Sequence, residues 1–204
     1  MLLDDFRRKF QHRSPALQGV SREYAVLVPL VEQPEGLSLL YQVRSAQLRH
    51  HAAEVCFPGG RMDPGETPEQ CALRETWEEL GIGSEHIEII GLCDRLYTRS
   101  GSLMHPVLAK VDDAALATMR YSENEVQDTF LVPVSYLQTH PPRIYRYELQ
   151  PMVGEDFPYE LIGRDRSYPW VSGSMEVPVY EGLPYPLWGL TGRITHWLMD
   201  TMKD

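Results

Sequence analysis

The sequence predicts an α/β protein in which a mixed β-sheet is covered by helices on both faces, an α/β/α sandwich. Two apolar runs, residues 24–31 and 37–43, have the length and composition of buried strands, and a turn-like Gln-Pro-Glu-Gly segment joins them. A well-marked helix follows at 68–80, and an amphipathic stretch at 187–202 closes the chain. Strands before and after a single helix, with a second helix at the end, favour this layered architecture.

The remaining elements follow in order along the chain. Phe6 and Phe10 stand at helical spacing and indicate a short leading helix. Four further strands are expected, at 86–92, 104–111, 130–134 and 143–149. A turn is expected at 99–101 and a short helical turn after residue 134, whereas the Gly-, Pro- and aromatic-rich stretch 150–177 predicts no regular element. Because no repeat, low-complexity tract or linker interrupts the chain, residues 1–204 are expected to form a single domain.

Composition narrows the function classes. With 204 residues and 43% apolar content, the chain can bury a sizeable core. The net charge of −10 disfavours nonspecific binding to nucleic acid or to a membrane surface, so neither partner is expected. Three cysteines without C-x-x-C spacing are typical of reduced thiols. Since the sequence has neither a signal-like N-terminus nor a membrane-length apolar run, it predicts a cytoplasmic protein.

The helix at 68–80 has unusually clear start and stop signals. Thr67 is a favourable N-cap, and Gln70 three residues later completes a capping box. Pro68 occupies the first helical position, where its missing N–H has no consequence, and Gly81 is a typical C-terminal stop. The sequence therefore fixes the limits of this helix.

Three carboxylates gather on this helix. Glu75, Glu78 and Glu79 are expected on the face opposite to the apolar one, and like charges at these spacings repel by a few tenths of a kcal/mol per pair. The apolar face is expected to carry Leu73, Thr76, Trp77 and Leu80. A bound divalent cation such as Mg²⁺ or Mn²⁺, which prefers oxygen ligands, would offset the repulsion between the carboxylates. The alternative is a solvated acidic helix face.

The sequence pattern around the helix favours a metal-binding cluster over a solvated acidic face. The segment fits the pattern G-x5-E-x7-R-E-U-x-E-E-x-G-U, where U is a bulky apolar residue. The matching residues are Gly60, Glu66, Arg74, Glu75, Glu78, Glu79, Gly81 and Ile82. Only Thr76 departs, at a U position, and its methyl group can still pack on a core. The segment resembles the Nudix box, the signature of hydrolases that cleave a nucleoside diphosphate linked to another group, and this implies the Nudix-type sandwich with a mixed β-sheet.

The resemblance also implies site residues. The expected catalytic residues are Arg74, Glu75, Glu78, Glu79 and Glu125. The metal ligands among them are Glu75, Glu78 and Glu79, which would hold Mg²⁺ or Mn²⁺. Arg74 and Glu66 are expected to orient the carboxylates. Outside the box, Glu125 matches a Glu-Val pair of the family as a base or extra ligand, with Glu123 as the competing choice.

A second motif bears on the substrate. Residues 40–60 resemble L-L-T-x-R-S-x-x-x-R-x-x-x-G-x-x-x-F-P-G-G, the upstream motif of the coenzyme A diphosphatase (pyrophosphatase) branch. Tyr41, Gln42 and Ala53 depart from it, and the missing glycine at Ala53 matters if that position needs a positive φ. Stretches 98–107 and 187–194 are similar to the same branch. The expected substrate-binding residues are Arg44, Ser45, Arg49, Gly59, Gly60, Thr98 and Ser100.

The resemblance implies metal-dependent hydrolysis of coenzyme A and its derivatives, as small-molecule substrates, to 3′,5′-ADP and 4′-phosphopantetheine. The arginines suit phosphates because a guanidinium binds them with a bidentate fork; the alternative is that Arg44 and Arg49 are surface charges paired with Glu54 or Glu66. Two other functions stay open: a Nudix hydrolase of ADP-ribose or dinucleotide polyphosphates, and a non-catalytic nucleotide-binding regulator. The sequence does not fix the oligomeric state, and a homodimer is among the options.

Overall fold

The computed structural model describes residues 2–203, and its centre is one eight-stranded mixed β-sheet. The strands of this sheet are β1 (Arg22–Gln33), β2 (Gly36–Arg44), β3 (Val55–Cys56), β4 (Gly59–Arg61), β5 (Ile87–Leu92), β6 (Leu96–Tyr97), β7 (Ser102–Val111) and β8 (Val126–Pro133). Their order is β3-β2-β1-β7-β5, with β4 paired to β1, β6 to β7 and β8 to β2. Only the long β1–β7 pair is parallel, so the expected mixed sheet is confirmed.

The two ends of β1 have different neighbours, and this opens a gap that receives the site. Residues 30–33 of β1 pair with β2, whereas residues 24–26 pair with the short strand β4. Beyond its contact with β1, strand β2 pairs with β3 through residues 42–43, while β8 pairs with β2 over residues 38–44. The segment that contains β3 and β4 therefore lies between two diverging strands, next to the helix that carries the carboxylates.

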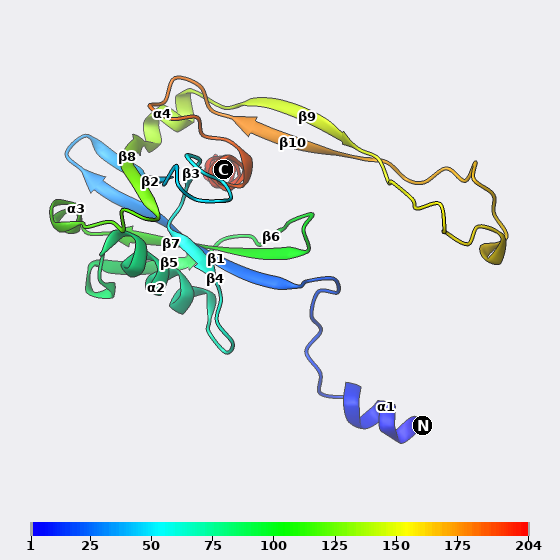
Figure 1. Cartoon of the computed structure of the whole chain (residues 1–204). Helices are drawn as coiled ribbons and strands as arrows, with labels where there is room; N and C mark the ends of the chain where they lie inside the picture. Colours follow the sequence, from blue (N-terminus) through cyan, green and yellow to red (C-terminus); the bar gives the residue numbers. More distant parts are fainter. Residues whose placement is uncertain (1, 204) are drawn as a thin grey trace.

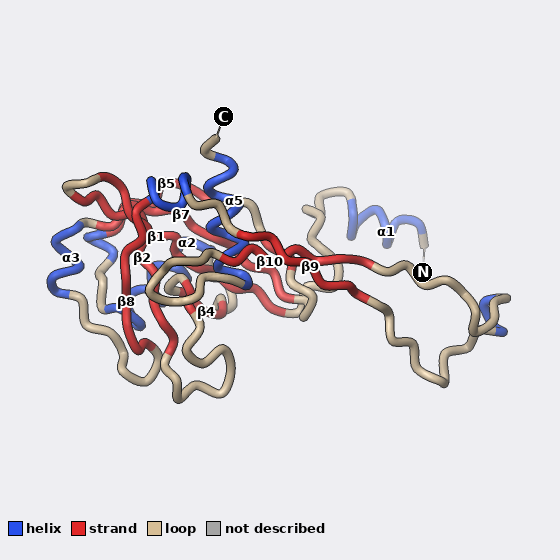
Figure 2. Tube along the Cα trace, turned by 90° about the horizontal axis from the view of Figure 1, so that it is seen from above, coloured by secondary structure: helices blue, strands red, loops and turns tan. Residues whose placement is uncertain are grey.

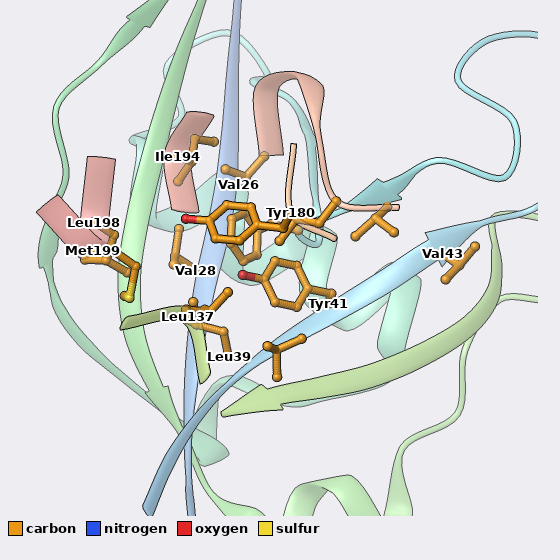
Figure 3. Packing of buried hydrophobic residues seen from close by; sticks show 14 residues of the cluster. Val26, Val28, Leu39, Tyr41, Val43, Leu137, Tyr180, Ile194, Leu198 and Met199 are labelled. Atoms are coloured by element: carbon orange, nitrogen blue, oxygen red, sulfur yellow. The ribbon is translucent and has the colours of Figure 1, made fainter. Parts of the chain in front are cut away.

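Two helices cover the sheet on opposite faces, as Figure 1 shows. Helix α2 (Pro68–Leu80) packs on one face, over a core that includes Ala25, Leu27 and Leu40. Helix α5 (Gly189–Thr201) packs on the other, where the rings of Tyr41 and Tyr180 lie at the centre of the second core (Figure 3). Successive residues of β1 and β2 thus point to opposite faces of the sheet and into different cores, as strand geometry requires. The predicted α/β/α sandwich is confirmed.

The predicted elements were found with small shifts in their limits. Helices α1 (Leu3–Phe10) and α4 (Val134–Thr139), and the turn that Gly101 closes onto Thr98, lie where the sequence places them. The elements that the sequence did not predict are β3, β4, β6, α3 (Asp113–Thr118), two 3₁₀ turns (Ser84–His86 and Glu160–Ile162) and β10 (Gly173–Val179). Most of these are too short to show a periodic pattern.

A two-stranded ribbon projects from the sandwich. Strand β9 (Arg143–Leu149) pairs with β10 in register across seven residues, and the intervening chain extends the ribbon away from the sheet (Figures 1 and 2). Strand β9 was expected to be half-exposed, but six of its seven residues are exposed, because it pairs with β10 in a separate two-stranded ribbon and not with the eight-stranded sheet. Arg99, in the β6–β7 turn, stacks on Tyr147 of β9 at 4.3 Å.

Between residues 2 and 203, no helix is both long enough and apolar enough to cross a membrane.

Candidate active site

Helix α2 begins and ends at the predicted residues. The Thr67 N–H donates to Gln70 Oε1 at 2.9 Å and the Gln70 N–H donates to Thr67 Oγ1 at 3.3 Å, which is the reciprocal capping box. Gly81 ends the helix with φ of 68°, and a Cβ there would lie 2.8 Å from the carbonyl oxygen of Arg120. The close approach of this loop explains why glycine is needed at the position.

The loop after α3 closes the end of the helix. The N–H groups of Arg120 and Ser122 donate to the carbonyls of Leu80 and Glu79, both at 3.0 Å. These bonds satisfy two C-terminal carbonyls that the helix leaves without partners. They also bring the following residues, Glu125 among them, to the acidic side of α2.

The buried face of α2 differs from the predicted one. Trp77 was expected on the core face but is 59% exposed, whereas Glu79 was expected on the open face and is 4% exposed. At the last turn of α2 the helix faces the gap between β1 and β2. Polar groups of β2 and β4 lie there and bury Glu79 in place of Trp77. Thr76 is buried as predicted, and its hydroxyl donates to the carbonyl of Ala72 at 2.7 Å, so a threonine is tolerated at an apolar position.

Glu79 lies in the gap with two hydrogen-bond donors. Its Oε2 accepts from the Gly59 N–H at 2.9 Å and from Gln42 Nε2 at 2.8 Å. Burial raises the pKa of the Glu79 carboxyl to about 7, although both donors and the nearby Arg44 favour the charged form. A carboxylate with so high a pKa needs a positive charge close by to stay ionised.

Glu75 faces the same region. Its carboxylate lies against the backbone of Gly60, where an added Cβ would come within 2.3 Å of it, so a larger residue there would displace the carboxylate from this position. Burial raises the pKa of Glu75, and the negative charges of Glu78 and Glu125 raise it further, against the lowering effect of Arg74. Glu125 is therefore within electrostatic reach of Glu75.

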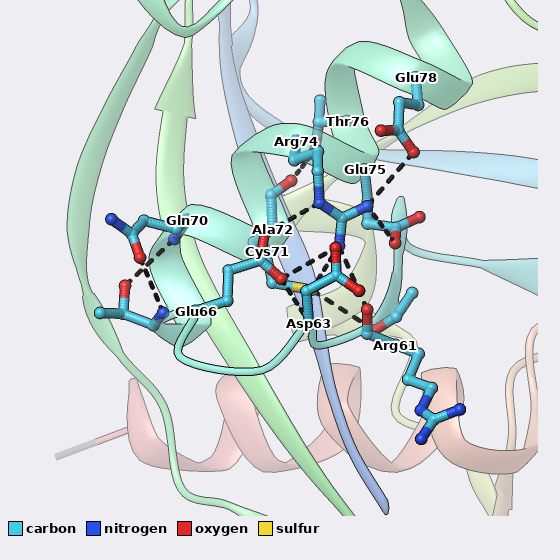
Figure 4. Close-up of polar contacts among 12 residues, drawn as sticks. Arg61, Asp63, Glu66, Gln70, Cys71, Ala72, Arg74, Glu75, Thr76 and Glu78 are labelled. Carbon is cyan, nitrogen blue, oxygen red and sulfur yellow. Dashed lines mark hydrogen bonds and ion pairs between the residues drawn. The ribbon is translucent and has the colours of Figure 1, made fainter.

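Arg74 connects the carboxylates (Figure 4). Its Nε and one terminal nitrogen form a fork to Glu66 at 2.9 and 3.1 Å, and the other terminal nitrogen donates to Glu75 at 2.7 Å and to Glu78 at 3.3 Å. The fork lowers the pKa of Glu66 to about 2 and raises that of Arg74 above its ordinary value. Arg74 and Glu66 thus have the geometry expected of residues that orient the carboxylates.

These oxygens suit a hard divalent cation. Within residues 2–203, no three acidic, histidine or cysteine side chains already converge as a closed set of metal ligands. Glu75 and Glu78 turn toward Arg74 and Glu79 toward Gln42, as expected of carboxylates that repel one another. The fit lies in the donor chemistry: the side chains supply oxygen ligands only, and burial raises the pKa of two of the carboxyl groups, whose charge a cation would offset.

The upstream motif leads directly to this region. Arg44 ends β2 and lowers the pKa of Glu79 through its charge, and its buried Nε has no hydrogen-bond partner within the described chain. The Ser45 N–H donates to the carbonyl of Glu125 at 2.8 Å. Glu54 pairs with His51 and Glu66 with Arg74, so the alternative that Arg44 pairs with either glutamate is wrong. The Nε of Arg44 is left for another acceptor.

The turn inside this motif is strained where the glycine is missing. Ala53 has φ of 57°, a left-handed conformation that L-residues avoid. Its N–H donates to the carbonyl of Arg44 at 3.2 Å, and the Arg44 N–H donates to the carbonyl of Glu54 at 2.9 Å. These bonds hold the unfavourable conformation, so the suspicion that this position needs a positive φ is confirmed.

Three other predicted substrate residues have no direct bond to the carboxylates within residues 2–203. Arg49 is exposed and makes no ion pair within residues 2–203. Thr98 and Ser100 bond to each other at 2.9 Å in the β6–β7 turn, and no hydrogen bond joins that turn to the carboxylates in the described chain. Hydrogen bonds, ion pairs and charge effects connect the carboxylates, Arg74, Arg44, Ser45 and the glycine pair, whereas for Arg49, Thr98 and Ser100 a role at the site stays a prediction.

Gln42 belongs to the site although the sequence did not predict it. Gln42 stood out only as a departure from the upstream motif, yet its side chain reaches Glu79. The available signal was its setting: it is a polar residue within an otherwise apolar buried strand, and such residues need a partner.

Comparison with known proteins gives the family. The model of the NUDIX domain matches residues 21–149. Nudix hydrolase 3 of Caenorhabditis elegans is 34% identical over 84% of this chain and 70% of its own length. The mitochondrial coenzyme A diphosphatase NUDT8 of Homo sapiens is 30% identical over 96% of this chain and 76% of its own. The solved Nudix hydrolase RenU of M. smegmatis has a TM-score of 0.49 at 23% identity, over 59% of this chain and 77% of its own. With the box, the sandwich and the acidic helix in place, the chain belongs to the Nudix hydrolase family and is a Nudix diphosphatase.

Proposed function

We propose that this Nudix hydrolase cleaves the diphosphate bond of coenzyme A and its derivatives, giving 3′,5′-ADP and 4′-phosphopantetheine. The observation that carries the proposal is Arg44: its buried Nε has no partner, and it stands beside Glu79 at the end of the upstream motif. A buried guanidinium donor without an acceptor is costly, and a phosphate oxygen would satisfy it. Relatives at 30–34% identity that are named coenzyme A diphosphatases support the same substrate.

In this proposal the carboxylates bind the cation. Glu75, Glu78 and Glu79 would hold Mg²⁺ or Mn²⁺, which supplies charge neutralisation for the diphosphate and activation of water. Arg74 orients Glu75 and Glu78 and is itself held by Glu66. Divalent ions are the general cofactor of Nudix hydrolases, and the choice between these two ions is part of the proposal.

The residues around the carboxylates bind and orient the substrate. Arg44 and Ser45 would line the approach to Glu79. At Gly59 a Cβ would lie 2.3 Å from the carbonyl oxygen of Ala25, so this glycine lets the backbone pack against β1, and a substrate contact of Gly59 and Gly60 stays a prediction from the motif. Glu125 accepts a proton from the attacking water or acts as a further ligand. Substrate contact by Arg49, Thr98 and Ser100 stays a prediction from the motif. In this proposal they contact parts of the substrate that are distant from the diphosphate.

Substrate profiling tests the proposal. The protein is incubated with Mg²⁺ and, separately, with coenzyme A, ADP-ribose, NADH and diadenosine polyphosphates, and the products are identified by mass. The expected result is the fastest turnover with coenzyme A and the release of 3′,5′-ADP. Preferential cleavage of ADP-ribose or a dinucleotide would contradict the substrate assignment, and no turnover of any substrate would favour a non-catalytic regulator.

Several broader predictions remain proposals. We treat residues 1–204 as one Nudix domain with the β9–β10 ribbon as its extension, since the ribbon base packs beside α5 (Figure 1). A cytoplasmic location and a homodimer are predictions from the sequence. Sedimentation of the purified protein tests the second.

A further inference from the structure

Gln42 is a buried polar residue whose own hydrogen bonding is incomplete. It is 0% exposed in β2, between Tyr41 and Val43. Its Nε2 donates to Glu79 Oε2 at 2.8 Å and lies 3.4 Å from Cys56 Sγ. Its Oε1 is buried and has no partner within residues 2–203. An apolar residue would pack here without leaving an acceptor unsatisfied, so the amide serves something other than packing.

The orientation of the amide is fixed by Glu79. Exchanging the amide oxygen and nitrogen would bring Gln42 Oε1 against a carboxylate oxygen, where two acceptors repel. The unsatisfied oxygen is therefore the consequence of directing the N–H group at Glu79. The interaction that decides the orientation of Gln42 is the bond to this one carboxylate oxygen.

This bond makes the two oxygens of Glu79 unequal. Oε2 accepts from both Gln42 and the Gly59 N–H, at 2.8 and 2.9 Å. Oε1 has no hydrogen-bond donor in the described chain. Two donors from two different strands fix the rotation of the carboxylate and leave Oε1 available to another ligand.

We propose that Gln42 is a positioning residue that orients Glu79 so that its free Oε1 faces the cation. The inference rests on the proposed function in taking Glu79 as an ion-binding carboxylate. Partners of this kind fix the orientation of metal-binding groups, and their loss typically lowers metal affinity. The upstream motif has threonine at this position, whose short side chain lacks the length of glutamine, so this chain has its own means of holding the carboxylate.

The test uses Gln42→Met, which keeps an unbranched side chain of similar size and removes the donor. The matched control is Cys56→Ala, which removes the other acceptor of the same amide. Mn²⁺ binding is measured from the electron paramagnetic resonance signal of the free ion, in the absence of substrate. We expect Gln42→Met to weaken Mn²⁺ binding by about 10- to 100-fold and Cys56→Ala to leave it unchanged. In turnover, kcat should fall while KM for the substrate stays within about twofold, because Gln42 does not touch the substrate.

A double-variant cycle separates positioning from packing. In the Glu79→Gln background, Gln42→Met should change Mn²⁺ affinity little further, since the residue acts through Glu79. Additive losses, or a Gln42→Met variant that is less stable but binds Mn²⁺ like the wild type, would overturn the inference. Failure of the wild type to cleave coenzyme A would reject the proposed substrate and leave the Mn²⁺ measurement as an independent test of Gln42.

Discussion

Replacing Glu79 with glutamine should stabilise the metal-free protein at alkaline pH while abolishing its activity. Glutamine has nearly the shape of glutamate, and its amide oxygen can take the place of Oε2, which accepts from Gly59 and Gln42. What the substitution removes is the charge, buried in a side chain that is only 4% exposed. The variant therefore isolates the electrostatic effect of one carboxylate.

The size and direction of the effect follow from the raised pKa. Below pH 4.5 the carboxyl is protonated in both the folded and the unfolded chain, so it does not oppose folding. Between that pH and its folded pKa of about 7, the unfolded chain releases the proton first, and stability falls as pH rises. Above pH 7 the loss is complete. A shift from 4.5 to about 7 corresponds to at most about 3 kcal/mol, or ~6–12 °C in Tm for a chain of this size.

Thermal unfolding of the two proteins in a chelator, at pH 5 and pH 8, measures the effect. We expect similar Tm values at pH 5 and a higher Tm for Glu79→Gln at pH 8. Saturating Mg²⁺ should raise the Tm of the wild type more than that of the variant, because the ion offsets a charge that the variant lacks. A variant less stable than wild type at pH 8, or one with near-wild-type turnover in Mg²⁺, would refute the reasoning.

Three further substitutions test other parts of the site. Glu125→Gln should lower kcat by about 100-fold and Glu123→Gln far less; the reverse order in a steady-state assay would show that the wrong acid was chosen. Arg44→Ala should lower kcat/KM for coenzyme A by roughly 10- to 150-fold, with partial recovery in Arg44→Lys and a smaller loss in Arg49→Ala; parallel losses of Tm would instead indicate a structural role. Ala53→Gly should raise stability by about 0.5–1 kcal/mol, since the relief of a left-handed alanine exceeds the added chain entropy; an unchanged or lower denaturant midpoint would contradict this.

Local signals predicted the elements whose limits are set by local chemistry. The capping box at Thr67 and Gln70 and the stop at Gly81 appear in the structure as expected, because each depends on residues within one turn of the helix. The buried runs that became β1, β2 and β7 were also found, since fully buried strands are continuous in their apolar residues. In these segments the local pattern and the tertiary environment agree.

Non-local pairing was harder to predict. Strand β10 exists only because it pairs with β9 across an intervening stretch of chain, and nothing in its own sequence specifies that partner. Strands β3 and β4 are two and three residues long and form where diverging β1 and β2 leave unpaired edges. The wrong prediction for Trp77 and Glu79 on helix α2 has the same origin. Helical periodicity predicts which residues share a face, but the neighbouring strands decide which of those residues are buried.

The departures from local rules concentrate in one part of the molecule, and this argues for its function. A buried glutamate, an unsatisfied amide oxygen, an unpaired guanidinium nitrogen and a left-handed alanine all lie in β2, its following loop or the facing end of α2. Each destabilises the folded chain on its own, and packing explains none of them. One ligand that carries a cation and phosphate oxygens would relieve two of them: the cation would offset the charge of Glu79, and a phosphate oxygen would accept from Arg44. Because one ligand class would relieve an irregularity on β2 and another on α2, the clustering of these departures supports the proposal that a metal-bound diphosphate binds here.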